Sequence, residues 1–291
     1  MKLKLVTCLV AAFFVTACSD DNVPAQKELT LSLTNLEPST ANEKYEGWLM
    51  VNGSPVSTGT FTVNGSKVLS QTVFEIPAAT LAAATDFVLS IEPTPDTDPA
   101  PSAIKLAGGT FSGNSASVSV AHAAALGNNF ASAAGKFILA TPTTAATNDE
   151  LSGVWFLDNS SGTPAVGLTL PILPSGWAYE GWAVINSNPV SSGTFTSVSG
   201  SDNNASYSGP ASPPPFPGED FVANAPSGLT FPTNLASGLV VISIEPSPDN
   251  NPAPFALKPL LANVSATAVD HVVYNFTNQV STTFPGGSVS R

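Results

Sequence analysis

The chain contains two copies of one sequence pattern, and this duplication constrains its fold more than any other feature. Matching blocks lie 134 residues apart, as Tyr45 and Tyr179 do, and a later block recurs after 153 residues, as Ile91 and Ile244 do. The matched blocks are 45–48 with 179–182, 55–62 with 189–196, and 90–93 with 243–246. Three matches in the same order indicate two homologous units in tandem, the second with 19 additional residues.

Each copy has the pattern of short β-strands separated by turns. Residues 29–33 alternate apolar and polar side chains, which is the period of a half-buried strand. Residues 45–51 end at Asn52-Gly53, a pair that favours a tight hairpin because both residues tolerate positive φ. The helical signal is weak, and the chain holds 26 prolines and 22 glycines. We therefore predict an all-β fold of two tandem β-sandwich (Ig-like) domains.

The N-terminus has the architecture of a secretion signal. Lys2 and Lys4 precede an apolar stretch, 5–15, that is too short to span a bilayer, which needs about 20 residues. The string 15–18, Val-Thr-Ala-Cys, resembles a bacterial lipobox. That resemblance implies cleavage before Cys18 and a lipid anchor of three acyl chains, such as palmitate, on this cysteine. The alternative is an ordinary secretory signal with a chance cysteine.

The residues after the anchor bear on localisation. Cys8 leaves with the signal and Cys18 is capped, so we expect no disulfide, thiol nucleophile or cysteine metal site. The tract 19–21, Ser-Asp-Asp, has two open interpretations: a solvated linker, or a tract resembling the export signal of some Gram-negative surface lipoproteins. We expect a protein of the cell envelope, anchored in the outer membrane and facing outward.

The repeated motifs carry a family resemblance. The pattern comprises Tyr-x-x-Trp, Pro-Val-Ser-x-Gly-x-Phe, an apolar strand ending in Ile-Glu-Pro, and, in the first copy, Leu-Ala-Gly at 106–108. It resembles the C-terminal extracytoplasmic domain of anti-sigma-K factors, in which a membrane helix and a zinc-bearing sigma-binding module precede the domain. The sequence shows neither a membrane helix nor the cysteines and histidines for that zinc site. The resemblance therefore implies the fold of the outer module, without sigma-factor binding.

These observations together predict the organisation of the chain. We expect a signal peptide at 1–17, a lipidated tether at 18–26, a first anti-sigma-K-like domain at 27–134 and a second one at 135–291. The second domain is expected to open with a hairpin made by 137–140 and 154–157, which have no clear counterpart in the first copy. It also carries a proline-rich insert, 199–228.

Residues present in both copies are expected to fix the fold rather than to react. They are Tyr45, Trp48, Gly59 and Glu92 in the first copy, and Tyr179, Trp182, Gly193 and Glu245 in the second. Glu46 with Glu92, repeated as Glu180 with Glu245, could form the paired carboxylates of a glycosidase, yet chemistry rarely needs two complete sites in one chain. A hydrolase would require two carboxylates about 5–9 Å apart in a cleft.

No other catalytic or metal-binding set is evident. His122 and His271 are the only histidines, and no Gly-x-Ser-x-Gly elbow precedes either, so a structural or surface role is favoured. Asp96-x-Asp98, with the oxygen-rich 249–251 in the second copy, hints at calcium, but a calcium loop needs more ligands and a glycine. We favour a proline-stiffened exposed loop and leave calcium binding there open. We therefore predict no catalytic residue, no metal site and no cofactor.

The insert 199–228 is not explained by duplication. Its candidate binding residues are Tyr207, Phe216, Glu219, Asp220 and Phe221. Two interpretations stay open: an exposed surface that binds a partner, and a long loop that packs over its own domain. We expect the second domain to fold without the insert.

Charge and composition limit the partners. The net charge is −12, which argues against nucleic acid and anionic lipid surfaces as ligands. The prediction is a non-enzymatic envelope lipoprotein, attached to the membrane by its lipid and binding another envelope protein or a glycan. The alternative is an extracytoplasmic sensory or regulatory component related to anti-sigma factors, and a glycoside hydrolase is the third class considered.

Overall fold

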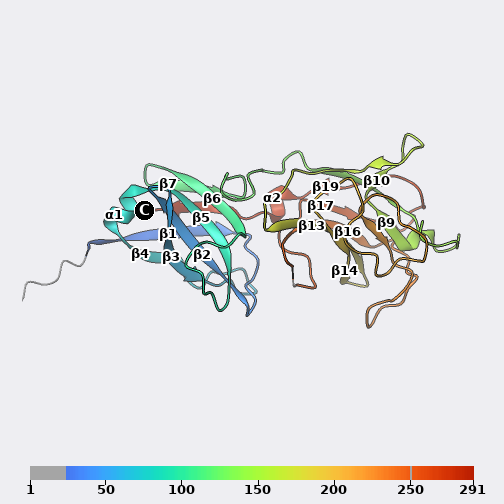
Figure 1. Ribbon diagram of the computed structural model, residues 1–291, viewed down its shortest axis with the longest axis horizontal. Coiled ribbons are helices and arrows are strands. Elements are labelled where there is room, and N and C mark those ends of the chain that lie inside the picture. The colour runs from blue at the N-terminus through green and yellow to red at the C-terminus, as the bar shows by residue number, and fades with distance from the viewer. Residues whose placement is uncertain (1–23, 250) are drawn as a thin grey trace, which may run out of the picture.

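The protein is built from antiparallel β-sheets, as predicted. The computed structural model describes residues 24–249 and 251–291, so Cys18 and the tract 19–21 lie outside the described residues. Two β-rich lobes lie side by side along the long axis of the molecule (Figure 1). The all-β fold class predicted from the strand periodicity and turn residues is therefore confirmed.

The first lobe holds one sheet of eight strands. These are β1 (Gln26–Thr34), β2 (Glu43–Val51), β3 (Ser54–Phe61), β4 (Val73–Pro77), β5 (Ala84–Pro93), β6 (Lys105–Ser112), β7 (Ser115–Ser119) and β20 (Gly286–Ser290). Their order is β3-β2-β5-β6-β7-β20-β1-β4, and one short helix, α1 (Ala78–Ala83), joins β4 to β5. Leucines that alternate along β1 face the core of this lobe, as the period of two requires.

The second lobe holds the remaining strands. These are β8 (Ala134–Leu139), β9 (Gly153–Trp155), β10 (Leu157–Asp158), β11 (Ala165–Val166), β12 (Leu168–Thr169), β13 (Trp177–Ile185), β14 (Asn188–Phe195), β15 (Gly218–Asp220), β16 (Leu239–Pro246), β17 (Leu260–Asn263), β18 (Tyr274–Asn275) and β19 (Thr277–Asn278). One sheet has the order β14-β13-β16-β17-β19, and another has β12-β8-β9-β15 with β18 also on β8. A 3-10 turn, η1 (Glu150–Ser152), and a short helix, α2 (Val280–Thr283), lie in its connections.

The repeated sequence blocks form the same supersecondary unit in both lobes. The hairpin β2–β3 turns at Asn52 and Gly53 with φ of 51° and 78°, and β13–β14 turns at Asn186 and Ser187 with φ of 51° and 65°. Both hairpins contain a register shift at the Gly-Trp step, after Gly47 in β2 and after Gly181 in β13. The duplication therefore preserves the bulge as well as the strands.

A chain of hydrogen bonds, repeated in the two lobes, links the tryptophan of each motif to its neighbours. Trp48 Nε1 donates to Ser90 Oγ at 2.8 Å, and Ser90 in turn donates to the buried carboxylate of Glu92. Trp182 Nε1 donates to Ser243 Oγ at 2.7 Å, and Ser243 hydrogen bonds to Glu245. These contacts satisfy polar groups inside the sheet, which is how a buried indole and a buried carboxylate are accommodated.

The repeated tyrosines and glutamates also make matching backbone contacts. Tyr45 donates to the carbonyl of Glu37 at 2.8 Å, and Tyr179 donates to that of Pro171 at 2.6 Å. The carboxylate of Glu92 accepts from a backbone N–H of the proline-rich loop, at Ser102, and that of Glu245 accepts from Phe255. Each glutamate thus fixes the loop that follows its own strand.

The predicted hairpin of 137–140 with 154–157 is confirmed by the pairing of β8 with β9, whereas the last strand of the chain returns to the first lobe. β8 follows β7 in the chain but pairs with β9, β12 and β18 of the second lobe. β20 follows β19 and α2 but lies between β7 and β1 of the first lobe, where Figure 1 shows the C-terminal end. The segment expected as the second domain, 135–291, therefore differs from the second lobe, because its last strand belongs to the first sheet.

The two segments that cross between the lobes contact each other. The rings of Phe130 and Phe284 meet edge to face with centroids 5.3 Å apart. The side chain of Asn278 donates to the carbonyls of Phe130 and Ala133, and that of Asn35 donates to the carbonyl of Phe284. At the far end of β20, the guanidinium of Arg291 donates to the carbonyls of Leu81 and Ala84.

Candidate functional site

The part of the insert 199–228 that holds most of the candidate binding residues, 216–221, is buried in the second lobe, whereas the rest of the insert is exposed or half-buried. Phe216, Glu219, Asp220 and Phe221 are all buried, with Glu219, Asp220 and Phe221 fully so, and only Tyr207 lines a hollow. The interpretation of these five residues as an exposed binding loop is therefore wrong for four of them. The reason is that residues Gly218–Asp220 form β15, which pairs with β9 and turns the neighbouring side chains inward.

The two acidic side chains of β15 are structural ties. Asp220 accepts from Trp155 Nε1 at 2.8 Å and from the backbone N–H of Thr143 at 2.9 Å. Glu219 accepts from the backbone N–H of Tyr207 at 3.2 Å and from the hydroxyl of Ser208. Burial raises the pKa of both carboxyls, and these hydrogen bonds act against that rise. The expectation that the second domain folds without the insert consequently has no structural support.

Three other carboxylates gather at one end of the second lobe. Glu180 on β13, Glu245 on β16 and Asp249 in the following loop each place one oxygen within 4.8 Å of the others. The register explains the first two, because β13 and β16 are antiparallel neighbours in which Glu180 faces Ser243 and Ala178 faces Glu245. Residues two apart in a strand point to the same side, so both glutamates project from one face. The following loop then brings Asp249 over them.

Glu180 has an unusual environment within this cluster. Its side chain is 5% exposed, and Oε1 accepts from the hydroxyl of Ser191. Oε2 is buried and has no hydrogen-bond partner. Burial, together with the nearby carboxylate of Asp249, raises the pKa of Glu180 to about 7 against the lowering effect of the hydrogen bond from Ser191. A buried oxygen left without a partner is costly, so its presence requires an explanation.

Two other carboxyls near Glu180 also have raised pKa values. Burial raises the pKa of Glu245 to about 8, with added repulsion from Asp249 and Glu180. Burial likewise raises the pKa of Asp202, in the insert, to about 7, with added repulsion from Glu219 and Glu180. Asp202 accepts from the backbone N–H of Gly218 at 2.8 Å, which holds it against the lobe.

A polar hollow opens onto this cluster. Its volume is about 580 Å³, and we call it the acidic pocket; its lining residues include Glu180, Asp249, Ser191, Asn203, Asn204, Ser206, Tyr207 and Ser247. A neighbouring hollow of about 370 Å³ shares Asn203 and Ser247 and reaches Asp202. The strands of the repeat supply the floor, and the insert supplies one wall.

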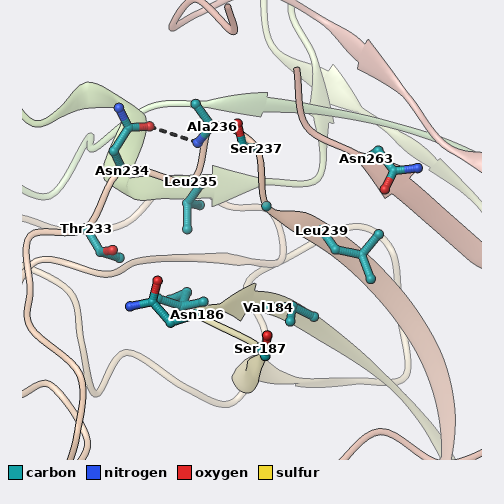
Figure 2. A pocket seen from close by; sticks show the side chains of 12 residues that line it. Val184, Asn186, Ser187, Thr233, Asn234, Leu235, Ala236, Ser237, Leu239 and Asn263 are labelled. Carbon is teal, nitrogen blue, oxygen red and sulfur yellow. Dashed lines mark hydrogen bonds between the residues drawn. The ribbon is translucent and has the colours of Figure 1, made fainter. Parts of the chain in front are cut away.

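A third hollow lies at the opposite end of β13. It has a volume of about 440 Å³ and is lined by the β13–β14 turn and the segment 233–238, as Figure 2 shows. Its lining side chains are uncharged, and within it the side chain of Asn234 accepts from the backbone N–H of Ala236 at 2.8 Å. Because no titratable group lines it, this hollow has no residue for acid-base catalysis or for binding a charged ligand.

The remaining sequence candidates do not converge on a site. His122 lies 3.2 Å from Asp86, and His271 contacts Asp270 on the surface, so the two histidines occupy separate places. In the first lobe, the carboxylates of Asp96 and Asp98 each accept a backbone N–H two residues further on. These two aspartates shape their own turn, as expected for a proline-stiffened loop.

Sequence reasoning found parts of the acidic pocket but did not assemble them. It singled out Glu180 and Glu245 as repeated scaffold residues and placed Asp249 in an oxygen-rich loop. It missed Asp202 and Asn203, for which the Asp-Asn-Asn string at 202–204 was the available signal. Only the strand register and the fold of the insert bring these groups together.

Glu180 and Glu245 lack the contrasting pKa values of a glycosidase pair. A retaining glycosidase separates its carboxyl groups by about 5–5.5 Å, and an inverting one by more. The nearest carboxylate oxygens here lie within 4.8 Å of one another, which does not by itself separate the two kinds of site. Burial raises the pKa of both Glu180 and Glu245, whereas a glycosidase needs one of its two carboxyls ionised at neutral pH.

Comparison with known proteins assigns no name to this site. No family model, no curated protein and no solved structure matches the chain. Across the residues that the structure describes, none of the helices has the length and apolar character needed to cross a membrane.

Proposed function

We propose that this chain is a lipid-anchored binding protein of the cell envelope, without catalytic activity, and that its ligand enters the acidic pocket of the second lobe. The observation that carries the proposal is the unpartnered, buried Oε2 of Glu180 beside that pocket. Such an oxygen is expected where a ligand, absent from the protein alone, completes the contacts.

The sequence supports the envelope location and the class of partner. The lipobox-like segment 15–18 and the acidic tract after Cys18 favour an anchored protein on the outer membrane. The polar wall made by Asn203, Asn204 and Ser206 suits a hydroxyl-rich glycan or a cationic patch of another envelope protein. The alternative, an extracytoplasmic sensory component, keeps its support from the Tyr-x-x-Trp and Ile-Glu-Pro motifs that resemble anti-sigma-K factors.

Blocking the pocket tests the binding role. Ser247→Trp places a large ring at the wall of the acidic pocket, whereas Thr94→Trp changes the equivalent exposed position of the first lobe. The full chain, in both variants and in the original form, is probed against a glycan array and purified envelope fractions. We expect Ser247→Trp to lose binding by about tenfold or more and Thr94→Trp to keep it. Equal binding by both variants would place the ligand elsewhere.

Replacing the lipidated cysteine tests the anchor. Cys18→Ser removes the thiol that would carry the acyl chains, so the protein should move from the membrane fraction to the soluble envelope fraction. The measurement is immunoblotting of separated fractions from cells that produce either form. If the Cys18→Ser protein stays with the membrane, the lipid anchor is refuted.

A further inference from the structure

We propose that Glu180, Glu245 and Asp249 together bind a divalent cation, with Ca²⁺ preferred, at the floor of the acidic pocket. This inference rests on the proposed function for the location of the ligand site and names one ligand of that site. Its test uses the cation alone, so it can succeed or fail independently of any glycan or protein partner.

The geometry of the three oxygens suits one ion. Three oxygens that lie within 4.8 Å of one another surround a point no more than about 2.8 Å from each, close to the Ca²⁺–oxygen distance of about 2.3–2.6 Å. Mg²⁺ requires contacts near 2.0–2.1 Å and strict octahedral geometry, which needs a tighter group. The cluster contains no histidine or cysteine, the ligands that zinc prefers.

The rest of the coordination shell is within reach. Ca²⁺ takes about six to eight oxygens, so three carboxylates must be supplemented. The acidic pocket is roomy enough for several waters, and its wall carries the side-chain oxygens of Asn203, Asn204 and Ser206. A cation held there would also be open to a ligand in the pocket, because the carboxylates occupy only one side.

The unpartnered oxygen of Glu180 is an observation separate from the clustering of acids. The side chain is 5% exposed and lines the acidic pocket; its Oε2 accepts no hydrogen bond, and the neighbouring carboxyl of Asp249 could donate one only when protonated. Its counterpart Glu46 occupies the same place in the first-lobe hairpin and accepts from Ser57 just as Glu180 accepts from Ser191. Within the described part of the chain, Glu46 shows no such buried, unpartnered oxygen and belongs to no group of three carboxylates.

The surrounding charges leave the cluster unneutralised. Asp202 and Glu219 add negative charge from the insert side. Lys258, a basic residue that interacts with Glu245, donates hydrogen bonds to the carbonyls of Pro254 and Phe255. A bound cation would neutralise the mutual repulsion of the carboxylates. Without the cation, protonation of the carboxylates reduces that repulsion.

Calorimetric titration of the full chain with CaCl₂ tests the proposal. The protein is purified in detergent, stripped with EDTA and titrated near pH 8, and we expect one Ca²⁺ per chain and a higher Tm with Ca²⁺ than with EDTA. Glu180→Gln should weaken Ca²⁺ binding by at least about tenfold, because it removes one charged ligand. The matched variant Glu46→Gln should bind Ca²⁺ like the original chain.

A folding defect is separated from a binding defect by melting each variant in EDTA. Glu180→Gln should keep a cooperative transition there while losing the Ca²⁺-dependent rise in Tm. Absence of Ca²⁺ binding by the original chain would overturn the proposal, as would equal affinities of Glu180→Gln and Glu46→Gln. Tighter binding of Mg²⁺ than of Ca²⁺ would overturn the stated preference. If Ca²⁺ binds but Ser247→Trp leaves macromolecular binding unchanged, only the proposed function fails.

Discussion

The two lobes contain the same hydrogen-bonded scaffold but cover it differently. In the first lobe, the ring of Phe74 lies over Gly59, 3.2 Å from where a β-carbon would stand. In the second lobe, the carboxylate of Asp202 lies over the equivalent Gly193, with its carbon 2.6 Å from such a position. An apolar ring therefore covers the repeated glycine in the first lobe, and a carboxylate of the insert covers it in the second. An insertion can thus form the wall of a pocket while the repeated strands stay the same.

The comparison also singles out Glu180 among the repeated acids. Glu92 and Glu245 have matching hydrogen bonds in both lobes, which the fold alone explains. Glu180 has the contacts of Glu46 but also an oxygen that the fold leaves unpartnered. The duplicated chain therefore contains its own control, because each residue of the pocket floor can be compared with a counterpart outside the pocket.

The largest expected effect that distinguishes the lobes is a pH dependence of stability. The folded-state pKa values of Glu180, Asp202 and Glu245, about 7, 7 and 8, lie above their ordinary values of 4.5, 3.8 and 4.5. Their favourable contribution is complete below about pH 4 and is lost as the pH rises towards 8. In EDTA we expect Tm to fall from pH 5 to pH 8, by on the order of 5 °C.

Calorimetry of the full chain at several pH values checks this dependence. Glu180→Gln mimics the protonated acid, so it should flatten the curve and raise Tm at pH 8 in EDTA. Glu46→Gln is the matched control in the first lobe. A Tm that is constant or rises between pH 5 and pH 8 would contradict the assignment of raised pKa values to these three acids.

A smaller effect is expected at the paired glycines. Gly59 and Gly193 have φ of 111° and 132°, a region in which a β-carbon is strained, so alanine at either position should destabilise by roughly 1–3 kcal/mol. Gly193→Ala should cost about 1 kcal/mol more, because Asp202 is held by Gly218 and cannot move aside easily. Urea denaturation of both variants measures the difference. A greater loss of unfolding free energy in Gly59→Ala than in Gly193→Ala would show that the ring of Phe74 moves aside less easily than Asp202.

Much of the fold could be predicted from local pattern. The strands follow from alternation at 29–33, the hairpin from Asn52-Gly53, and the scaffold from the repeated Tyr-x-x-Trp blocks. These features depend on neighbouring residues and the period of two, which a sequence displays directly. The same comparison of copies located the insert, because an interruption of a repeat is visible without any structure.

The return of β20 to the first lobe could not be predicted in this way. Residues 286–290, Gly-Gly-Ser-Val-Ser, hold one apolar side chain, and nothing local states which sheet receives them. The burial of the candidate binding residues Glu219 and Asp220 likewise could not be predicted, since the donors that bind Asp220, Trp155 and Thr143, are remote in sequence. Long-range pairing and the satisfaction of buried polar groups depend on the assembled tertiary structure.

For the lipid-anchored binding protein proposed above, the return of β20 to the first lobe has a mechanical consequence. A pull on the second lobe is shared between two parallel covalent connections, one through 120–133 and one through 279–285, instead of passing through a single linker. Each connection ends in a strand that is hydrogen bonded along its length, β8 in one lobe and β20 in the other. A single protease cut in either connection would leave both lobes joined to the tether, so a bound ligand would stay attached to the membrane.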